Sequence, residues 1–570
     1  MSDNRPRALS KFWSLGIAIL AFLVCTVSLP AGQTAQGTHG VVAAIHPMAA
    51  KAALETMQEG GNAIDAAVTA ALVLGVVDGF NSGIGGGCFF LLRDKTGNFE
   101  AIDGREKAPN AATRSMFYRD GKADTALSQN GALAAGVPGS IAAYDYAVKH
   151  YGRLPFRRHL MKAAGLAESG FPITSAYLSR LISVKDQLFQ DEAARLVFFH
   201  GDGSLLKVGE ILHQQDLAET YKNIADHGAD WFYKGPFART TGAWMSDHHG
   251  VLSAADFAEY KLKKREPLVT TYRGYEIIGF PPPSSGGIHV AQILNILENF
   301  DLQKWGPDSP LTIHVIAEAM KLAFADRAFW LGDPDYAKVP KGLASKAYAK
   351  ELASQIRLDQ VIKVPGHGSP PESSTALFSR HTTHFSTADM EGNWVACTAT
   401  LNTTFGAKII IPGSGVVLNN QMDDFSIESG VPNFFGLVGA EANAVEPGKR
   451  PLSSMSPTII QKGGVPLYSL GGAGGPTIIS QTVLTIVRMI DFAMPLEKAM
   501  AAPRFHQQWQ PDKLVVEKSL AESILTVLRQ LGHNISLTEQ IGASQAAGFE
   551  GNKLVGFGEP RVSESSAQAF

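Results

Sequence analysis

The sequence has few cysteines, three in 570 residues. Cys25 lies in an apolar leader, and Cys88 and Cys397 lie in apolar stretches, so we expect two buried free thiols and no disulfide framework. Basic runs are also missing. The chain has 50 Lys and Arg against 53 Asp and Glu, a formal net charge of −3, which makes nucleic acid an improbable partner. We find no low-complexity tract and no repeat of solenoid period.

A second long apolar run is absent too, and the one that is present lies at the N-terminus. A positive start with Arg5, Arg7 and Lys11 precedes an apolar core over residues 15–27. This pattern predicts a signal peptide over residues 1–31. An uncleaved membrane anchor stays open as the alternative, although the core is short for a span of ~20 residues. We therefore expect an exported protein, periplasmic or secreted.

With 45% hydrophobic residues, the chain can bury a large core and is long enough for more than one domain. The beginning of the chain predicts an α/β class. In order, it contains a strand at 40–44, a helix from 47 to the Gly60–Gly61 pair, a second helix at 63–77, a glycine-rich turn at 82–87 and another strand at 88–93. The middle, about 140–350, is mostly helical, with a rigid turn at 281–287 before a helix at 288–297. Strands then dominate, at 382–388, 394–401, 416–418, 458–461 and 466–470, followed by a helix at 478–492.

The run His381-Thr382-Thr383-His384 raises the question of function. A threonine hydroxyl is a weak nucleophile unless a base lies beside it, and its own α-amine, with a pKa of about 7.7–8, can serve. That amine exists only if the chain is cut before Thr382. Residues 369–374 just upstream are polar and contain two prolines, so they predict a surface linker where a cut is tolerated. The alternative is that Thr382 is an ordinary β-branched strand residue.

Several segments together resemble the signature of the γ-glutamyltranspeptidases (glutathione hydrolases). They are, in chain order, 103–106, 281–287 with the helix after it, 325–327, 382–386, 401–406, 418–425, 450–457 and 471–475. The resemblance extends over almost the whole mature chain. It implies an N-terminal-nucleophile hydrolase with an αββα four-layer sandwich. It also implies self-cleavage into a large subunit, 32–381, and a small subunit, 382–570, that begins with the catalytic threonine.

The resemblance also implies roles for single residues. Thr382 is the nucleophile, Thr400 orients its hydroxyl, and the backbone N–H groups of Gly474 and Gly475 bind the oxyanion, a role that suits residues without a Cβ. For the glycines an ordinary turn remains the alternative. The segment 426–450 resembles a lid over the pocket, with Phe434 and Phe435 at its tip.

The substrate-binding roles follow charge. The α-carboxylate of a γ-glutamyl group is expected on Arg105, supported by Ser453 and Ser454, and its α-ammonium on Asp424, with Asn402 and Gln421. Other readings stay open. Arg105 can pair with Asp103 or Glu106, Asp424 can lie in a solvated turn, and the two serines can serve a turn.

No cofactor and no metal ion are expected. The run Asp247-His248-His249 has no third ligand at a convincing spacing, and His384 reads as structural because neighbouring strand residues point to opposite faces. The expected activity is γ-glutamyl transfer from glutathione or a similar compound to water or to an amino acid or peptide. A cephalosporin or glutaryl acylase of the same family and a non-catalytic binding protein are the alternatives.

Overall fold

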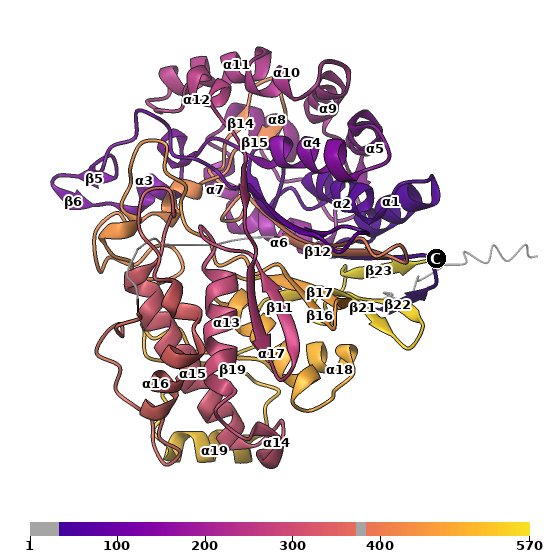
Figure 1. Cartoon of the computed structure of the whole chain (residues 1–570). Coiled ribbons are helices and arrows are strands. Elements are labelled where there is room, and N and C mark those ends of the chain that lie inside the picture. The colour runs from indigo at the N-terminus through magenta and orange to yellow at the C-terminus, as the bar shows by residue number, and fades with distance from the viewer. Residues whose placement is uncertain (1–33, 372–382) are drawn as a thin grey trace, which may run out of the picture.

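The computed structural model describes residues 34–371 and 383–570, and it is built from two facing β-sheets with helices on both outer faces (Figure 1). The expected signal peptide, the expected nucleophile Thr382 and the end of the linker from residue 372 on lie outside the described residues. Within the described parts, no helix is long and apolar enough to cross a membrane.

One sheet carries the strand that follows Thr382. Within this sheet, each strand runs antiparallel to its neighbours. In spatial order they are β23 (Ser566–Ala569), β2 (Gly40–Ala44), β12 (Thr383–Asp389), β13 (Trp394–Thr400), β3 (Gly87–Arg93), β4 (Phe99–Gly104) and β9 (Lys263–Arg265). Every residue of β12 and β13 is buried, which is typical of strands covered on both faces.

The second sheet is also antiparallel throughout. Its order is β1 (Thr34–Gly37), β22 (Lys553–Phe557), β21 (Ala543–Glu550), β17 (Val465–Ala473), β16 (Thr458–Lys462), β11 (Tyr275–Gly279) and β10 (Leu268–Tyr272). An apolar cluster between the sheets joins them, and in it the rings of Phe89 and Phe280 stack with centroids 4.2 Å apart.

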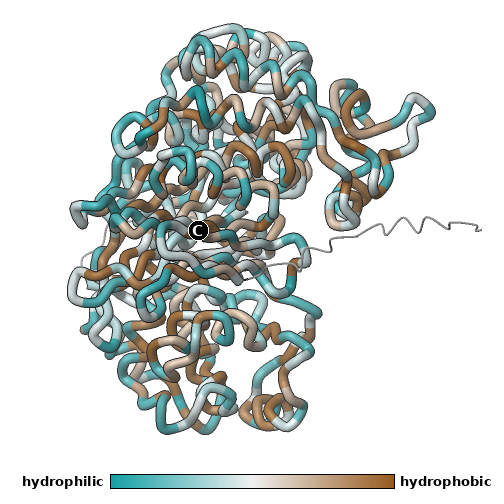
Figure 2. The backbone as a smooth tube through the Cα atoms, turned by 90° about the vertical axis from the view of Figure 1, so that its right-hand side faces the viewer, coloured by the Kyte–Doolittle hydropathy of each residue, from teal (hydrophilic) through white to brown (hydrophobic). Residues whose placement is uncertain are grey.

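Helices cover the outer face of each sheet (Figure 1). Over the first lie α1 (Pro47–Gln58), α2 (Ala63–Val77), α4 (Ser140–Tyr151), α5 (Phe156–Ser169) and α9 (Gln215–His227). Over the second lie α13 (Ser285–Leu297), α15 (Pro310–Trp330), α16 (Lys346–Gln355), α17 (Thr477–Ile490) and α19 (Glu522–Gln530). Hydrophobic stretches recur through these layers (Figure 2). The expected αββα sandwich is confirmed.

Further helices and strands complete the described structure. The helices are α3 (Thr125–Gln129), α6 (Ser175–Ser183), α7 (Lys185–Leu188), α8 (Glu192–Phe198), α10 (Ala229–Tyr233), α11 (Pro236–Asp247), α12 (Ala254–Ala258), α14 (Leu302–Trp305) and α18 (Leu496–Ala501). The strands are β5 (Tyr118–Arg119), β6 (Lys122–Ala123), β7 (Phe171–Pro172), β8 (Ile211–Leu212), β14 (Ile410–Ile411), β15 (Val416–Val417), β18 (Phe505–His506), β19 (Leu514–Glu517) and β20 (Ile535–Thr538).

Local sequence signals explain several boundaries. Asn62 caps α2 through a reciprocal capping box with Asp65, and α2 is buried along its whole length, as its continuous apolar sequence predicts. The helix expected from residue 288 begins earlier, at Ser285, because the Ser284 hydroxyl accepts the N–H of Gly286 and caps it. Cys88 and Cys397 are buried free thiols, as expected.

Both sheets contain strands from both sides of residue 382. In the first sheet β12 and β13 lie between β2 and β3, and in the second β16 pairs with β11. A chain cut before Thr382 would therefore yield two pieces that share one core.

Candidate active site

The site is centred on the start of β12, the strand that begins directly after Thr382. Thr383 pairs with Ala399, and Thr400 follows Ala399 as the last residue of β13. The buried Thr400 hydroxyl accepts the backbone N–H of Asn402 at 2.7 Å and can still donate its own proton. Thr383, which follows Thr382 in the sequence, thus pairs with Ala399, which precedes Thr400.

Asp78 lies directly behind this strand end. Its carboxylate accepts the Thr383 hydroxyl at 2.5 Å and the Asn81 amide at 3.0 Å. Burial raises the pKa of Asp78 to about 7, although these two hydrogen bonds favour the ionised form. Sequence reasoning missed Asp78. The available signal was an acidic residue at the end of a continuously apolar helix.

Arg105 and Asp424 form a buried ion pair, with Arg105 Nη2 2.5 Å from Asp424 Oδ2 and both side chains inaccessible to solvent. Arg105 also donates to the carbonyls of Pro451 and Leu452, at 2.9 and 3.0 Å, and lies 3.4 Å from Glu106. Burial raises the pKa of Asp424 well above its usual range, and the Arg105 guanidinium opposes that shift. Asp424 is therefore not in a solvated turn.

The two amides expected beside Asp424 are buried with it. Gln421 donates its amide N–H to Asp424 Oδ2, and Asn402 donates to the carbonyl of Asn420 at 3.0 Å. Among the described residues, neither Asn402 Oδ1 nor Gln421 Oε1 has a hydrogen-bond partner. A buried carbonyl oxygen without a donor is costly, so these two atoms mark a place where a ligand that donates hydrogen bonds would be stabilised.

Ser453 and Ser454 are fully buried in the segment that also supplies carbonyls to Arg105. The Ser453 hydroxyl accepts the N–H of Met455 at 3.1 Å, and the Ser454 hydroxyl accepts from Arg327 Nη2 at 3.0 Å. Arg327 is thus a second buried guanidinium close to the expected carboxylate site. Its segment, 325–327, contributes to the family resemblance, but sequence analysis assigned no role to Arg327.

Gly474 and Gly475 lie between the end of β17 and the start of α17. Their φ angles are +121° and +67°, and a Cβ on Gly474 would lie 2.8 Å from the Gly542 Cα. Such backbone favours glycine. The N-terminus of a 14-residue helix also favours negative charge beside it. Both features suit an oxyanion site.

A cavity of about 290 Å³ lies beside the strand end, lined by Thr383, Gly474, Asp78 and Arg180 among others. The described contacts bring Arg105, Asp424 and Gln421 into one group. Gly474 lines the cavity and has no described contact with that group.

The expected lid segment, 426–450, contacts Asp424 and its neighbour Asp423. Asn443 donates its amide to the Asp424 carbonyl at 2.7 Å, and the N–H of Phe434 lies 3.2 Å from Asp423 Oδ2. A small void of about 10 Å³ remains beneath it, lined by Arg327, Asp424 and lid residues. Phe434 is 55% exposed and contacts Phe435 edge-on, which agrees with a tip position for these two rings.

The other histidines named from sequence have structural contacts. His384 is fully buried between the hydroxyls of Thr398 and Ser386, and burial lowers its pKa to about 3. His248 follows α11 as expected and stacks on Trp244 at 3.9 Å.

Comparison with known proteins identifies the family. Residues 49–569 match the sequence profile of the family described as Gamma-glutamyltranspeptidase. The chain belongs to the γ-glutamyltranspeptidase family. It is 43% identical over 526 residues to a glutathione hydrolase proenzyme of Escherichia coli, covering 92% of this chain and 90% of the relative.

The family also includes acylases. The chain is 37% identical to the acylase ACY 1 proenzyme of a Pseudomonas species, with 90% of each chain covered. Among solved structures, a cephalosporin acylase from Bacillus halodurans superposes with a TM-score of 0.84 at 29% identity, covering 94% of this chain and 97% of that one. The γ-glutamyltranspeptidase of Helicobacter pylori gives 0.55 at 39% identity, covering 56% and 91%. The chain is thus an enzyme of a family that includes both glutathione hydrolases and acylases.

Proposed function

We propose that this protein is a γ-glutamyltransferase and glutathione hydrolase that matures by cutting itself before Thr382. The observation that carries the substrate assignment is the buried Arg105–Asp424 pair, beside two amide oxygens that have no donor among the described residues. A γ-glutamyl group is a zwitterion at its α-carbon. Its carboxylate can replace Asp424 on Arg105, and its ammonium can take the place of Arg105 on Asp424.

This exchange conserves charge in a buried site. Before substrate binds, Arg105 and Asp424 neutralise one another, so neither bears an uncompensated buried charge. In the complex each would meet an opposite charge of the substrate. The ammonium would also donate to Asn402 Oδ1 and Gln421 Oε1, which lack donors among the described residues. Ser453, Ser454 and Arg327 would support the carboxylate.

Maturation and turnover use the same hydroxyl. The Thr382 oxygen attacks the carbonyl of His381, the peptide C–N bond breaks to leave an ester and a free α-amine, and water hydrolyses the ester. The freed amine then takes the proton when the hydroxyl attacks a γ-glutamyl carbonyl. The amine of the donor leaves, and water or the amine of an amino acid or peptide accepts the acyl group from the ester.

The positions of Thr400, Gly474 and Gly475 support these steps. Thr400 follows the strand partner of Thr383, which suits a hydroxyl that orients the nucleophile. The two glycine N–H groups, at the start of α17, suit the oxyanion of both tetrahedral intermediates.

The acylase alternative uses the same nucleophile on an acyl group that lacks the α-ammonium. Asp424, Asn402 and Gln421 argue against it. A glutaryl group that took Arg105 would leave the Asp424 charge without a cation and the oxygens Asn402 Oδ1 and Gln421 Oε1 without donors. A non-catalytic binding protein would need no cut and would not require the glycine pair at a helix start.

Several wider statements belong to the proposal. The precursor is an exported zymogen of glutathione metabolism with a signal peptide over 1–31. It is periplasmic or secreted after processing, or held by an uncleaved anchor. The subunits 32–381 and 382–570 stay together because strands of both pair with one another in both sheets.

A denaturing gel with N-terminal sequencing tests the proposal. The purified protein should give two bands, and the smaller should begin at Thr382. Thr382→Ala should remain one chain and should release no product from a γ-glutamyl anilide. A small band that begins elsewhere, or an active Thr382→Ala protein, would show that the nucleophile is assigned wrongly. Thr383→Ala, which keeps Thr382, is the matched control and should still be cleaved.

A further inference from the structure

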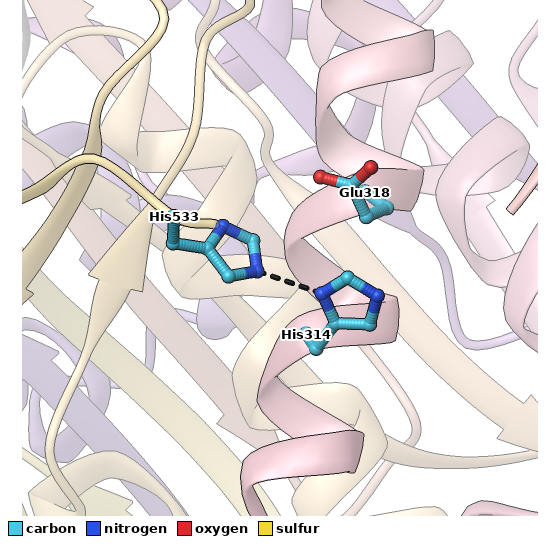
Figure 3. A group of neighbouring side chains, drawn as sticks. All are labelled: His314, Glu318 and His533. Carbon is cyan, nitrogen blue, oxygen red and sulfur yellow. Dashed lines mark hydrogen bonds between the residues drawn. The ribbon is translucent and has the colours of Figure 1, made fainter. Parts of the chain in front are cut away.

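Two histidines and a glutamate form a buried cluster outside the active-site residues (Figure 3). His314 and Glu318 lie one turn apart on α15, and His533 comes from the loop between α19 and β20. His314 and Glu318 are inaccessible to solvent, and His533 is 6% exposed. Within residues 34–371 and 383–570, this is the one group of three such side chains with the spacing of metal ligands.

The ligand atoms already converge. One nitrogen from each imidazole and one carboxylate oxygen all lie within 4.8 Å of one another. His314 Nδ1 is 2.7 Å from His533 Nε2, and His314 Nε2 is 2.6 Å from the Arg357 carbonyl. A carbonyl can only accept, so His314 carries its proton on Nε2 when neutral. Its Nδ1 lone pair therefore faces the cluster, the arrangement typical of histidines that bind metals.

The other two groups also suit a cation. His533 Nε2 points into the cluster, toward His314 Nδ1. Glu318 Oε2 accepts the N–H of Ile362 at 2.7 Å. Glu318 Oε1 lies 2.9 Å from Lys321 Nζ but makes no hydrogen bond of acceptable geometry.

We propose that His314, Glu318 and His533 bind a divalent transition-metal ion, with zinc as the ion that best fits two imidazoles and a carboxylate. Ligand bonds of about 2.0–2.1 Å in a tetrahedron separate two nitrogens by roughly 3.3 Å. The two rings must therefore move apart slightly from 2.7 Å. The ion replaces the proton between them, and His533 then carries its proton on Nδ1. Water completes the fourth position.

Lys321 is the group that opposes binding, and it has other partners. Its ammonium lies 3.3 Å from the Ile362 carbonyl and 3.5 Å from Asp512 Oδ1. The Asp512 side chain is 64% exposed, so it can follow the ammonium away from Glu318. Because a positive charge remains close, we expect weaker binding than at a closed structural zinc site.

The position of the cluster gives the ion a structural role. His314 and Glu318 precede residue 382, and His533 follows it. If the chain is cut as proposed above, the ion joins the large and small subunits. That consequence alone rests on the proposed cleavage, because metal binding itself does not require a cut. Sequence analysis predicted no metal ion in this protein. The three ligands form no local motif, because His314 and His533 are 219 residues apart.

Zinc chloride titrated into the chelator-treated full-length protein tests the site. Calorimetry and elemental analysis should give one zinc per chain. His533→Gln and Glu318→Gln should each weaken binding by at least about 10- to 100-fold. The double variant His248→Gln/His249→Gln, which alters an exposed pair directly after α11, is the matched control and should bind as the wild type does.

A second measurement needs no variant. X-ray absorption of zinc bound to the wild type should show nitrogen and oxygen ligands at about 2.0–2.2 Å, with two imidazoles. Zinc should also raise the urea concentration that separates the subunits, or that unfolds the uncut Thr382→Ala chain. The proposal is overturned if the wild type binds no zinc, if His533→Gln binds it equally well, if only the His248/His249 variant loses it, or if the spectrum shows no imidazole.

Discussion

Replacing Asp424 by Asn tests how the enzyme recognises its substrate. The Asn side chain keeps the size of Asp424 and an oxygen that can accept from Arg105, so the fold should survive. It removes the negative charge that the α-ammonium of a γ-glutamyl group would meet in a fully buried site. Leaving a buried charge without its partner costs roughly 2–5 kcal/mol, or about thirtyfold to several thousandfold in kcat/KM.

The assay compares γ-glutamyl anilide with glutaryl anilide, which differ by that ammonium alone. The wild type should prefer the γ-glutamyl compound by at least ~30-fold. Asp424→Asn should lower kcat/KM for γ-glutamyl anilide far more than for glutaryl anilide. Any general loss of folded protein affects both substrates equally, so the ratio reports recognition alone.

Asp423→Asn is the matched control. Asp423 accepts from the Ser128 hydroxyl at 2.6 Å and from the N–H of Phe434, and it has no described contact with Arg105. It should change both rates to a similar extent. Equal losses on both substrates in Asp424→Asn would refute the ammonium role, and a wild-type preference for glutaryl anilide would identify an acylase.

The other predictions concern the oxyanion site, the carboxylate site and a buried acid. Gly474→Ala places a Cβ 2.7 Å from the Thr477 hydroxyl at a φ of +121°, so kcat should fall about 10²–10³-fold with little change in KM; an unchanged kcat would contradict the oxyanion role. Arg105→Lys loses the bidentate contact with a carboxylate and should raise KM for γ-glutamyl anilide at least ~10-fold. An unaltered KM would show that Arg105 does not bind the substrate. Asp78 has a pKa raised from 3.8 to about 7, so its ionised form is disfavoured in the folded state, and stability falls as pH rises from about 4 through 7. Asp78→Asn removes this penalty, up to about 4 kcal/mol, so its Tm relative to wild type should increase between pH 5 and pH 8, and a pH-independent difference would refute the shift.

The sequence by itself determined the features that depend on local chemistry. Asn62 three residues before Asp65 predicts the start of α2, because a capping box needs only neighbouring residues. The continuous apolar run that follows predicts a buried helix. The motifs around Thr382, Asn402 and Asp424 were sufficient to predict the family and the αββα architecture, because each motif fixes residue types at fixed spacings.

The tertiary structure alone decided which distant groups meet. Arg105 was expected to face Asp103 or Glu106, or a substrate, but its shortest ion pair is with Asp424, 319 residues away. Asp78 meets Thr383 across 305 residues, and His314 meets His533 across 219. Such contacts arise when two sheets and their helices pack, and they depend on the burial of large apolar surfaces far from the polar groups themselves. No local pattern encodes them, so the sequence predicted the chemical groups of the site and only the fold decided their partners.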